Sequence, residues 1–418
     1  MNSRRDPPPD GHPLPVDLKL RQHEVQAVSG PGDCLAAAWT DDSRLDGLLG
    51  WTCGFAVSGD GGRSWSTPRF HKHAGFELSG NPTIAADNRG TVYAVAMSVA
   101  ENYAAGVLEF SSSADAGRTW SDWTTIVSKQ DGIPDRPRLL VTGARVLHLV
   151  FANVGRQRRG VPVLRSTIQI CSSDDLGRTW SQPQTISTGL HRSRWFISGY
   201  QGPAIIEMPN GQLRCSWADY YGNAVHVASG NPGGRLVGPP VRVSLKALPG
   251  TSPFSWLLGA TYGTPVTTMA ADPSGRRVLL SVHVAHVMGP VMLLGSDDGG
   301  RTWQRLGQLA RLGTNACIEF DATGRLHAVW TELRGRRVDI RYATSMDAGH
   351  MFSEGVSLAG NGAEIDLPRS SEEREACAMA LGSYQSLVVG PQGRISAFWI
   401  DLRAGLLRPR LYLSSWQA

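Results

Sequence analysis

Short stretches in which apolar and polar residues alternate recur along the whole chain, and Gly, Asp and Asn separate them. A turn glycine followed by an apolar run occurs seven times. Period-two alternation and β-branched residues predict β-strands at these places. No segment shows a helical period over a useful length. The runs are GDCLAAAW (from Gly32), GTVYAVAM (Gly90), GARVLHLVF (Gly143), GQLRCSW (Gly211), GRRVLLSV (Gly275), GRLHAVW (Gly324) and GRISAFW (Gly393).

A second motif, Ser-x-Asp-x-Gly-x-Ser/Thr-Trp, marks the end of the third strand of a unit; we call it the box. Ser and Asp side chains accept hydrogen bonds from turn amides, Gly adopts positive φ, and Trp covers the joint between sheets. The box therefore predicts a structural turn, because its one or two carboxylates are too few for a calcium loop. Strong copies begin at Ser58, Ser113, Ser173 and Ser296, and weaker ones at Ser229 and Ser345.

Four short antiparallel strands repeated at about 50 to 70 residues predict an all-β fold, a β-propeller of four-stranded antiparallel blades. Only six fourth strands are found, and residues 14–20 have the right length to supply the last one. We therefore predict seven blades, closed by this N-terminal strand, with six blades as the alternative. The domain would span residues 14–418, after a flexible Pro-rich tail of residues 1–13.

Composition and charge indicate which kinds of partner and cofactor to expect. The 418 residues are 41% hydrophobic and carry a formal charge of +5, with basic residues scattered along the chain, so neither nucleic acid nor membrane is an expected partner. The N-terminus lacks an apolar signal segment, which predicts a cytoplasmic protein, or a secreted one if a precursor signal was removed. The six cysteines lack metal-type spacing and are expected to be free thiols. We expect no metal or cofactor, and the sequence leaves the oligomeric state open.

The boxes resemble those of the Asp-box, or bacterial neuraminidase repeat, propellers of the sialidase superfamily, over residues from about 15 to 418. That superfamily includes sialidases, other glycosidases, polysaccharide lyases and non-catalytic binders. The last unit, GSYQSLVVGPQGRISAFW, resembles the Tyr-containing strand of sialidases, which implies that Tyr384 is a nucleophile. The string DRPRLLV resembles the family's FRIP motif and implies that Arg136 and Arg138 bind a substrate carboxylate. The first strand, HEVQAVS, has no arginine at the motif position.

Three long connections lead from a fourth strand to the next first strand: residues 187–202, 246–263 and 359–385. Loops on a rigid scaffold carry binding residues, and these lie at the mouth opposite the boxes. Arginine forks suit an anion, and aromatic rings suit the face of a sugar. We therefore expect an anionic small molecule or glycan, bound by Arg136, Arg138, Arg194, Trp195, Trp256, Tyr262 and Arg374.

Three functions remain open at this stage. A sialidase-like glycoside hydrolase would use Tyr384, with a nearby carboxylate such as Glu373 easing the loss of its proton. A lyase or another non-hydrolytic enzyme would use a pair such as Tyr200 and His191 to abstract a proton beside a carboxylate. A propeller that binds its ligand without chemistry is the third. We favour the hydrolase.

Overall fold

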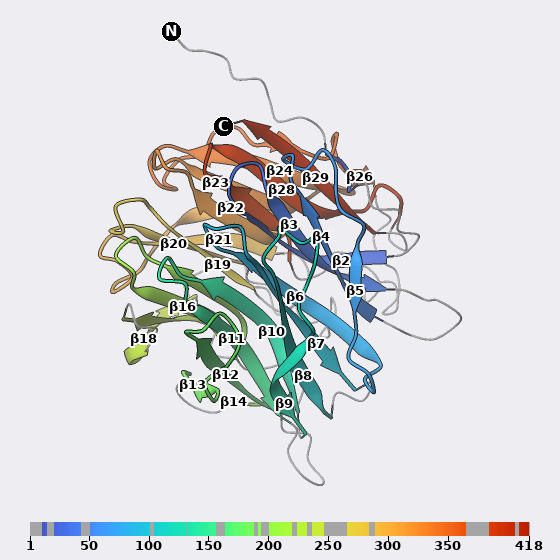
Figure 1. Cartoon of the computed structure of the whole chain (residues 1–418). Coiled ribbons are helices and arrows are strands. Elements are labelled where there is room, and N and C mark those ends of the chain that lie inside the picture. The colour runs from blue at the N-terminus through green and yellow to red at the C-terminus, as the bar shows by residue number, and fades with distance from the viewer. Residues whose placement is uncertain are drawn as a thin grey trace.

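The computed structural model describes residues 11–14, 21–42, 51–100, 104–130, 132–155, 164–187, 191–193, 200–219, 224–231, 236–245, 266–283, 289–364, 384–405 and 409–417. Within these ranges all regular structure is β-strand, as predicted. None of the described segments forms a helix of the length and apolarity needed to cross a membrane. Figure 1 shows the strands arranged as successive sheets from the blue to the red end of the chain.

Four separate sheets make up the first half of the chain, each with its strands in sequence order. Blade 1 contains β2 (Arg21–Ser29), β3 (Leu35–Asp42), β4 (Trp51–Ser58) and β5 (Arg69–His71). Blade 2 contains β6 (Leu78–Ala86), β7 (Val92–Val99), β8 (Gly106–Ser113) and β9 (Thr124–Lys129). Blade 3 contains β10 (Gly132–Val141), β11 (Leu147–Gly155), β12 (Leu164–Ser173) and β13 (Gln184–Thr185), with β14 (His191–Ser193) also paired to β12. Blade 4 contains β15 (Tyr200–Glu207), β16 (Leu213–Asp219), β17 (Ala224–Gly230) and β18 (Leu236–Ser244).

An eight-stranded sheet follows, and the long strand β22 (Gln304–Phe320) divides it into two blades. The first half of β22 pairs with β21 and the second half with β23. Blade 5 contains β19 (Thr267–Ala271), β20 (Val278–His283), β21 (Gly289–Ser296) and the first half of β22. Blade 6 contains the second half of β22, β23 (Leu326–Arg334), β24 (Arg337–Ser345), β25 (Val356–Ser357) and β26 (Ala363–Glu364). Blade 7 contains β27 (Ser386–Val389), β28 (Arg394–Asp401), β29 (Arg410–Gln417) and β1 (His12–Pro13).

The first strands of these seven blades contact one another in a closed circle. Contacts run from β2 to β6, β10, β15, β19, β22 and β27, and from β27 back to β2. The first strands are therefore the innermost ones, and the described residues form the predicted seven-bladed ring.

The ring is closed by the N-terminal segment, and the observed pairing begins before the predicted residues 14–20. His12 pairs with Leu413 and Pro13 with Tyr412, and the Leu14 amide donates to the Leu411 carbonyl at 3.0 Å. The sheet thus begins two residues before the expected domain boundary. Residues 15–20 lie outside the described part of the chain.

The boxes form the predicted turns with one repeated set of hydrogen bonds. In the third copy, the Ser173 hydroxyl donates to Asp175 at 2.7 Å, and Asp175 also accepts from the amide and hydroxyl of Thr179. Equivalent bonds occur in the boxes that begin at Ser58, Ser113, Ser296 and Ser345. Gly177 lies at φ +94° against Phe110 of the preceding blade, so any side chain there would overlap the ring. Each such turn is therefore structural and packs one blade on another.

Interblade packing is supplied by the apolar second strands. Trp39, Trp217 and Trp399 are fully buried near the ends of three of these strands. Two of them also satisfy their indole N–H: Trp39 donates to Asp41 at 3.1 Å and Trp399 to Asp401 at 3.0 Å. The five described cysteines are free thiols, as expected.

The box aspartates predict a pH-dependent contribution to stability. Hydrogen bonds from Thr179 and Ser173 lower the pKa of Asp175 from 3.8 to about 2. Because its folded pKa is the lower one, this contribution is present above about pH 4 and is lost as the pH falls toward 2. We expect Asp175→Ala to lower the midpoint of thermal unfolding at pH 7 by more than at pH 2.5.

Asp174→Ala is the matched control, because the exposed Asp174 lies in the same box and makes no hydrogen bond among the described residues. It should leave the midpoint unchanged at both pH values. Equal effects of the two variants in melts followed by circular dichroism would contradict the structural role of the box.

Candidate active site

The innermost strands share a β-bulge near their first residues. In β2, β6, β10, β15 and β22 the pairing register shifts, and the residue inside the shift has φ between +48° and +59°. A bulge re-aims a side chain, and positive φ in a residue other than glycine is strained and common at functional sites. The residues so placed are Glu24, Asn81, Arg136, Gly202 and Asn315.

Tyr384 occupies the same place in blade 7. After each innermost strand comes a turn in which one backbone amide donates a hydrogen bond to the carbonyl four residues later, as Thr142 does to Val146 and Gly390 to Arg394. The bulge residue lies six positions before the residue that provides this amide. Counting back six from Thr142 gives Arg136, and counting back six from Gly390 gives Tyr384. The repeat therefore places Arg136 and Tyr384 at one level of the axis.

Arg136 and Arg138 contact Tyr384, although 248 residues separate Arg136 from Tyr384. Arg136 Nη1 donates to the Tyr384 hydroxyl at 3.4 Å, and the Arg138 guanidinium carbon lies 4.0 Å from the centre of the Tyr384 ring. Blades 3 and 7 are not neighbours in the ring, so this contact lies at the axis itself. The structure thus brings together three residues that the sequence predicted for one site.

Two carboxylates lie beside this cluster. Asp135 Oδ2 is 3.6 Å from Arg136 Nε, and its other oxygen accepts a hydrogen bond from Asn81 Nδ2 at 3.4 Å. Glu24 accepts a hydrogen bond from the Thr40 hydroxyl at 3.1 Å, which in turn accepts one from the Asn81 amide. A polar network therefore joins Glu24 to Arg136 through three blades, and such buried networks hold their members in one geometry.

Burial and charge set the protonation states at the mouth. Burial raises the pKa of Tyr384 well above its usual value, although Arg136 and Arg138 act to lower it. Burial also raises the pKa of Asp135 and lowers that of Arg138. At the end of β20, burial and the positive charge of Arg136 lower the pKa of His283 to about 4, so this imidazole is neutral at pH 7.

Arg138 differs from Arg136 in its partners. Arg136 has Asp135 and Tyr384, whereas Arg138 forms no ion pair with a described residue, and its Nη1 is buried without a hydrogen-bond partner. A buried donor without an acceptor carries a desolvation cost that a ligand oxygen would remove. Arg136 Nε is also buried without a hydrogen bond, but it faces the Asp135 carboxylate at 3.6 Å, so Arg138 is the donor in this cluster that is best placed to bind an anion. No group of three or more side chains suited to a metal occurs among the described residues.

The second predicted tyrosine, Tyr200, belongs to blade 4. Tyr200 is buried at the start of β15, with its ring against Trp217 and His226 at 6.1 and 5.3 Å between centroids. Burial raises its pKa. Its backbone carbonyl accepts from the Ser166 hydroxyl, and Ser166 pairs with His191 of β14, whose side chain is outside the description. These contacts are those of a packed residue in blade 4.

Six other predicted site residues lie outside the described part of the chain, so their assignment stays a prediction: Glu373, Arg194, Trp195, Trp256, Tyr262 and Arg374.

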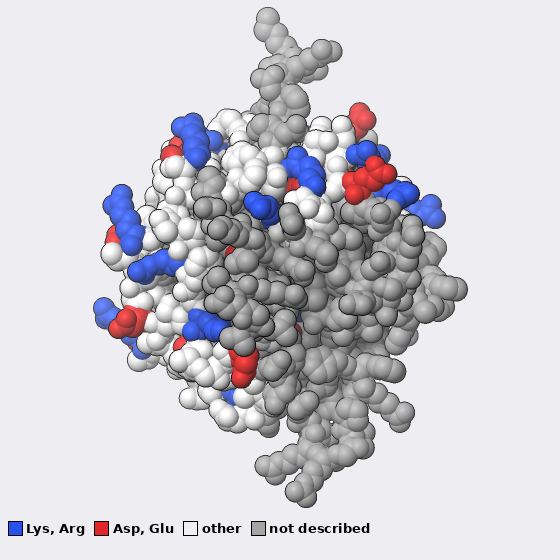
Figure 2. Space-filling view, turned by 90° about the vertical axis from the view of Figure 1, so that its right-hand side faces the viewer, with Lys and Arg blue, Asp and Glu red and all other residues white. Residues whose placement is uncertain are grey.

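Glu24, Asn81 and Asp135 were not predicted as site residues. Superposing the repeats would have found the first two, because they stand six residues before Gly30 and Asp87, as Arg136 stands before Thr142. Asp135 precedes the bulge residue of its own strand. Figure 2 shows charged side chains of both signs scattered over the described surface of one face, without a patch of a single sign.

Solved structures share this architecture. The chain is similar to an alpha-L-arabinanase of Penicillium chrysogenum complexed with arabinobiose (14% identity, 99% of each chain covered, TM-score 0.54). It is also similar to an alpha-L-arabinofuranosidase of Fusarium graminearum in complex with an iminosugar inhibitor (13% identity, 98% of each chain, TM-score 0.53). A Hadza microbial sialidase matches at 17% identity and TM-score 0.51, over 74% of this chain and 63% of its own length. At such identities the likeness is one of fold, shared with glycoside hydrolase propellers. No model of a protein family matches, and no curated protein matches by sequence.

The two arginines should respond differently to replacement by methionine, which keeps an unbranched stem. Arg136→Met leaves Asp135 and Tyr384 without their charged partner, and breaking a buried pair costs about 3 kcal/mol or more. Arg138→Met removes a buried charge that has no carboxylate partner, so stability should be unchanged or higher. Denaturant unfolding at pH 7 measures both, and equal losses in the two variants would contradict the assigned pairing.

Proposed function

We propose that the protein is a glycoside hydrolase of the Asp-box, sialidase-like kind, acting on an anionic sugar or a related small carboxylate at the axial mouth. The observation that carries the proposal is the contact of Arg136 and Arg138 with Tyr384 across the axis. The unsatisfied Nη1 of Arg138 supports an anionic group in the ligand, because an arginine fork matches a carboxylate.

In this proposal Tyr384 is the nucleophile. Its hydroxyl oxygen forms a bond to the anomeric carbon while the bond from that carbon to the leaving oxygen breaks. Water then hydrolyses the tyrosyl intermediate and releases the sugar. A buried phenol gives up its proton only with help, because burial raises the pKa of Tyr384.

Two features of the site supply that help. The positive charges of Arg136 and Arg138 both act to lower the pKa of Tyr384. Glu24 stands on the same level of the axis, and its negative charge acts to raise the pKa of the phenol, so it is close enough to Tyr384 for us to assign it as the proton acceptor. It takes the place that the sequence suggested for Glu373. Asp135 is held by Arg136 and is the less available carboxylate.

Binding without chemistry is the second candidate. The raised pKa of Tyr384 favours it, because a phenol that stays protonated at neutral pH donates and accepts hydrogen bonds but does not attack carbon. In that case the mouth would hold an anionic ligand and return it unchanged.

The hydrolase proposal predicts turnover that depends on Tyr384. We expect release of 4-nitrophenol from an aryl glycoside of a carboxylate-bearing sugar, and a loss of at least about 100-fold in kcat for Tyr384→Phe. Tyr412→Phe is the matched control, since Tyr412 lies in the same blade, is only partly buried and contacts Arg403 instead. Equal turnover by wild type and Tyr384→Phe would remove Tyr384 as the nucleophile. An unsaturated product that absorbs in the ultraviolet would indicate a lyase.

Arg138 should determine the preference for charge. Arg138→Met should raise KM for the carboxylate-bearing glycoside by about tenfold or more, while KM for a neutral arabinofuranoside changes little. Binding of the free acidic sugar in calorimetry, with no product after long incubation, would support the non-catalytic alternative. A wild-type preference for the neutral glycoside would contradict the anionic substrate and leave the hydrolase in place.

A further inference from the structure

A cavity of about 480 Å³ lies at the other end of the innermost strands. It is lined by residues at or after the ends of β15, β19 and β22, together with Gly143 of blade 3. The Tyr384 cluster lies where the innermost strands begin. Asn315, at the level of that cluster, and Glu319, in the cavity, are four positions apart on β22, which is about 13 Å along a strand. The two sites therefore occupy opposite ends of the axis.

The cavity wall combines apolar side chains with acidic ones. Met208, Met269 and Pro273 contribute apolar surface, and Met side chains adapt to ligands of different shape. Four of the lining residues carry carboxylates, and none is Lys, Arg or His. The acidic residues are Glu207, Asp272, Glu319 and Asp321.

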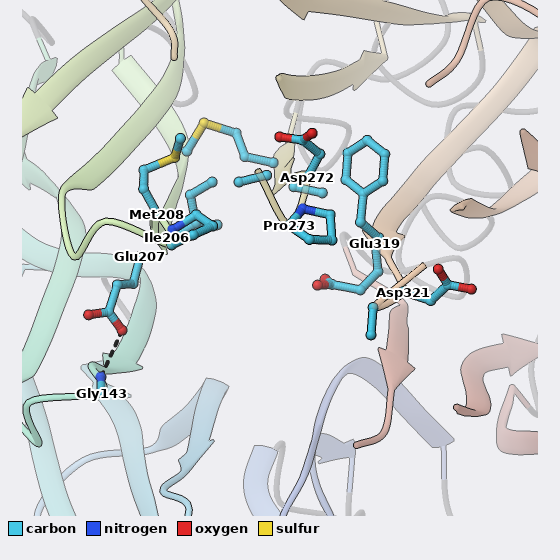
Figure 3. A pocket seen from close by; sticks show the side chains of 14 residues that line it. Gly143, Ile206, Glu207, Met208, Asp272, Pro273, Glu319 and Asp321 are labelled. Atoms are coloured by element: carbon cyan, nitrogen blue, oxygen red, sulfur yellow. Dashed lines mark hydrogen bonds between the residues drawn. The ribbon is translucent and has the colours of Figure 1, made fainter. Parts of the chain in front are cut away.

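Three of these carboxylates already have partners. Glu207 accepts from the Gly143 amide at 2.7 Å, which Figure 3 shows as a dashed line. Asp272 accepts from the Ser274 hydroxyl and the Arg277 amide. Asp321 accepts from Thr323 and the Arg325 amide and contacts His327 at 3.2 Å. These three carboxylates therefore accept hydrogen bonds from residues of the turns between first and second strands.

The Glu319 carboxyl group forms no hydrogen bond or ion pair with any described residue. In Figure 3 its carboxyl group points from β22 into the space toward Glu207 and Met208, whereas that of Asp321 points away. The titratable groups around it are Glu207, Asp272 and Asp321, with Cys317 on the same face of β22. His327 of β23 lies opposite Glu319 in the strand register, and its imidazole contacts Asp321. No positive side chain among the lining residues balances it.

We propose that this cavity is a second binding site, for an organic ammonium compound whose charge lies beside Glu319 and whose apolar part packs on the Met and Pro side chains. A carboxylate without a partner in a partly apolar cavity is stabilised by a cation that brings its own apolar surface. A bare divalent ion fits less well, because it needs several free oxygen ligands and only Glu319 is uncommitted. The ligand of this site is opposite in charge to the one proposed for the axial mouth.

Titration calorimetry with benzyltrimethylammonium tests the site, because this probe keeps its charge at every pH. We expect saturable binding at millimolar concentrations and a loss of about tenfold or more in Glu319→Gln. Glu354→Gln, an exposed glutamate of blade 6, should bind like wild type. Benzyl alcohol, which has the ring without the charge, should bind more weakly than the cation.

The pH dependence of the wild type gives a second, independent reading. Burial raises the pKa of Glu319 to about 7, so its charge is largely present at pH 8 and largely absent at pH 6. Affinity for the probe should therefore fall about tenfold over that interval. Absence of binding, binding that is unchanged in Glu319→Gln, or affinity that does not vary between pH 8 and 6 would each overturn the proposal.

Discussion

Seven innermost strands that must meet around one axis are the constraint on which the remaining structure depends. Each strand contacts the next, and the last contacts the first. Closing the circle packs the last blade against the first, and the N-terminal residues His12 and Pro13 complete the last blade as its outer strand. Because the circle is closed, residues far apart in sequence face one another at its centre.

Crowding at the axis is met by bulges in five of the innermost strands, and these bulges determine what faces the centre. Positive φ at Glu24, Asn81 and Arg136 costs free energy that the surrounding sheets must supply. As a result, polar side chains face the centre at one level of the axis, where Arg136 donates a hydrogen bond to Tyr384. The boxes, by contrast, lie at the other end of the blades, and their aspartates form hydrogen bonds within their own turns.

The two ends of the axis differ in charge and in what is left unsatisfied. At the mouth, Arg138 has a buried donor without an acceptor. At the far end, Glu319 has a carboxylate without a partner among the described residues. In both places the neighbouring charged groups are bound to protein partners, so one group at each end is available to a ligand. That division supports an anion at the mouth and a cation at the far end.

The sequence by itself determined the fold and predicted three residues of the candidate site. Period-two alternation and the repeated boxes are local signals, so they predicted the strands, the turns and the seven blades. The motifs around Arg136, Arg138 and Tyr384 assign these residues to one site, and the structure places the three side chains in contact. Only the tertiary structure decided that Glu24 and Asp135 join them, that Tyr200 is a packed residue of blade 4, and that Glu319 faces a cavity. These facts depend on which strands bulge and on which side chains meet across a closed ring. The residue pattern of a single repeat predicts neither of these.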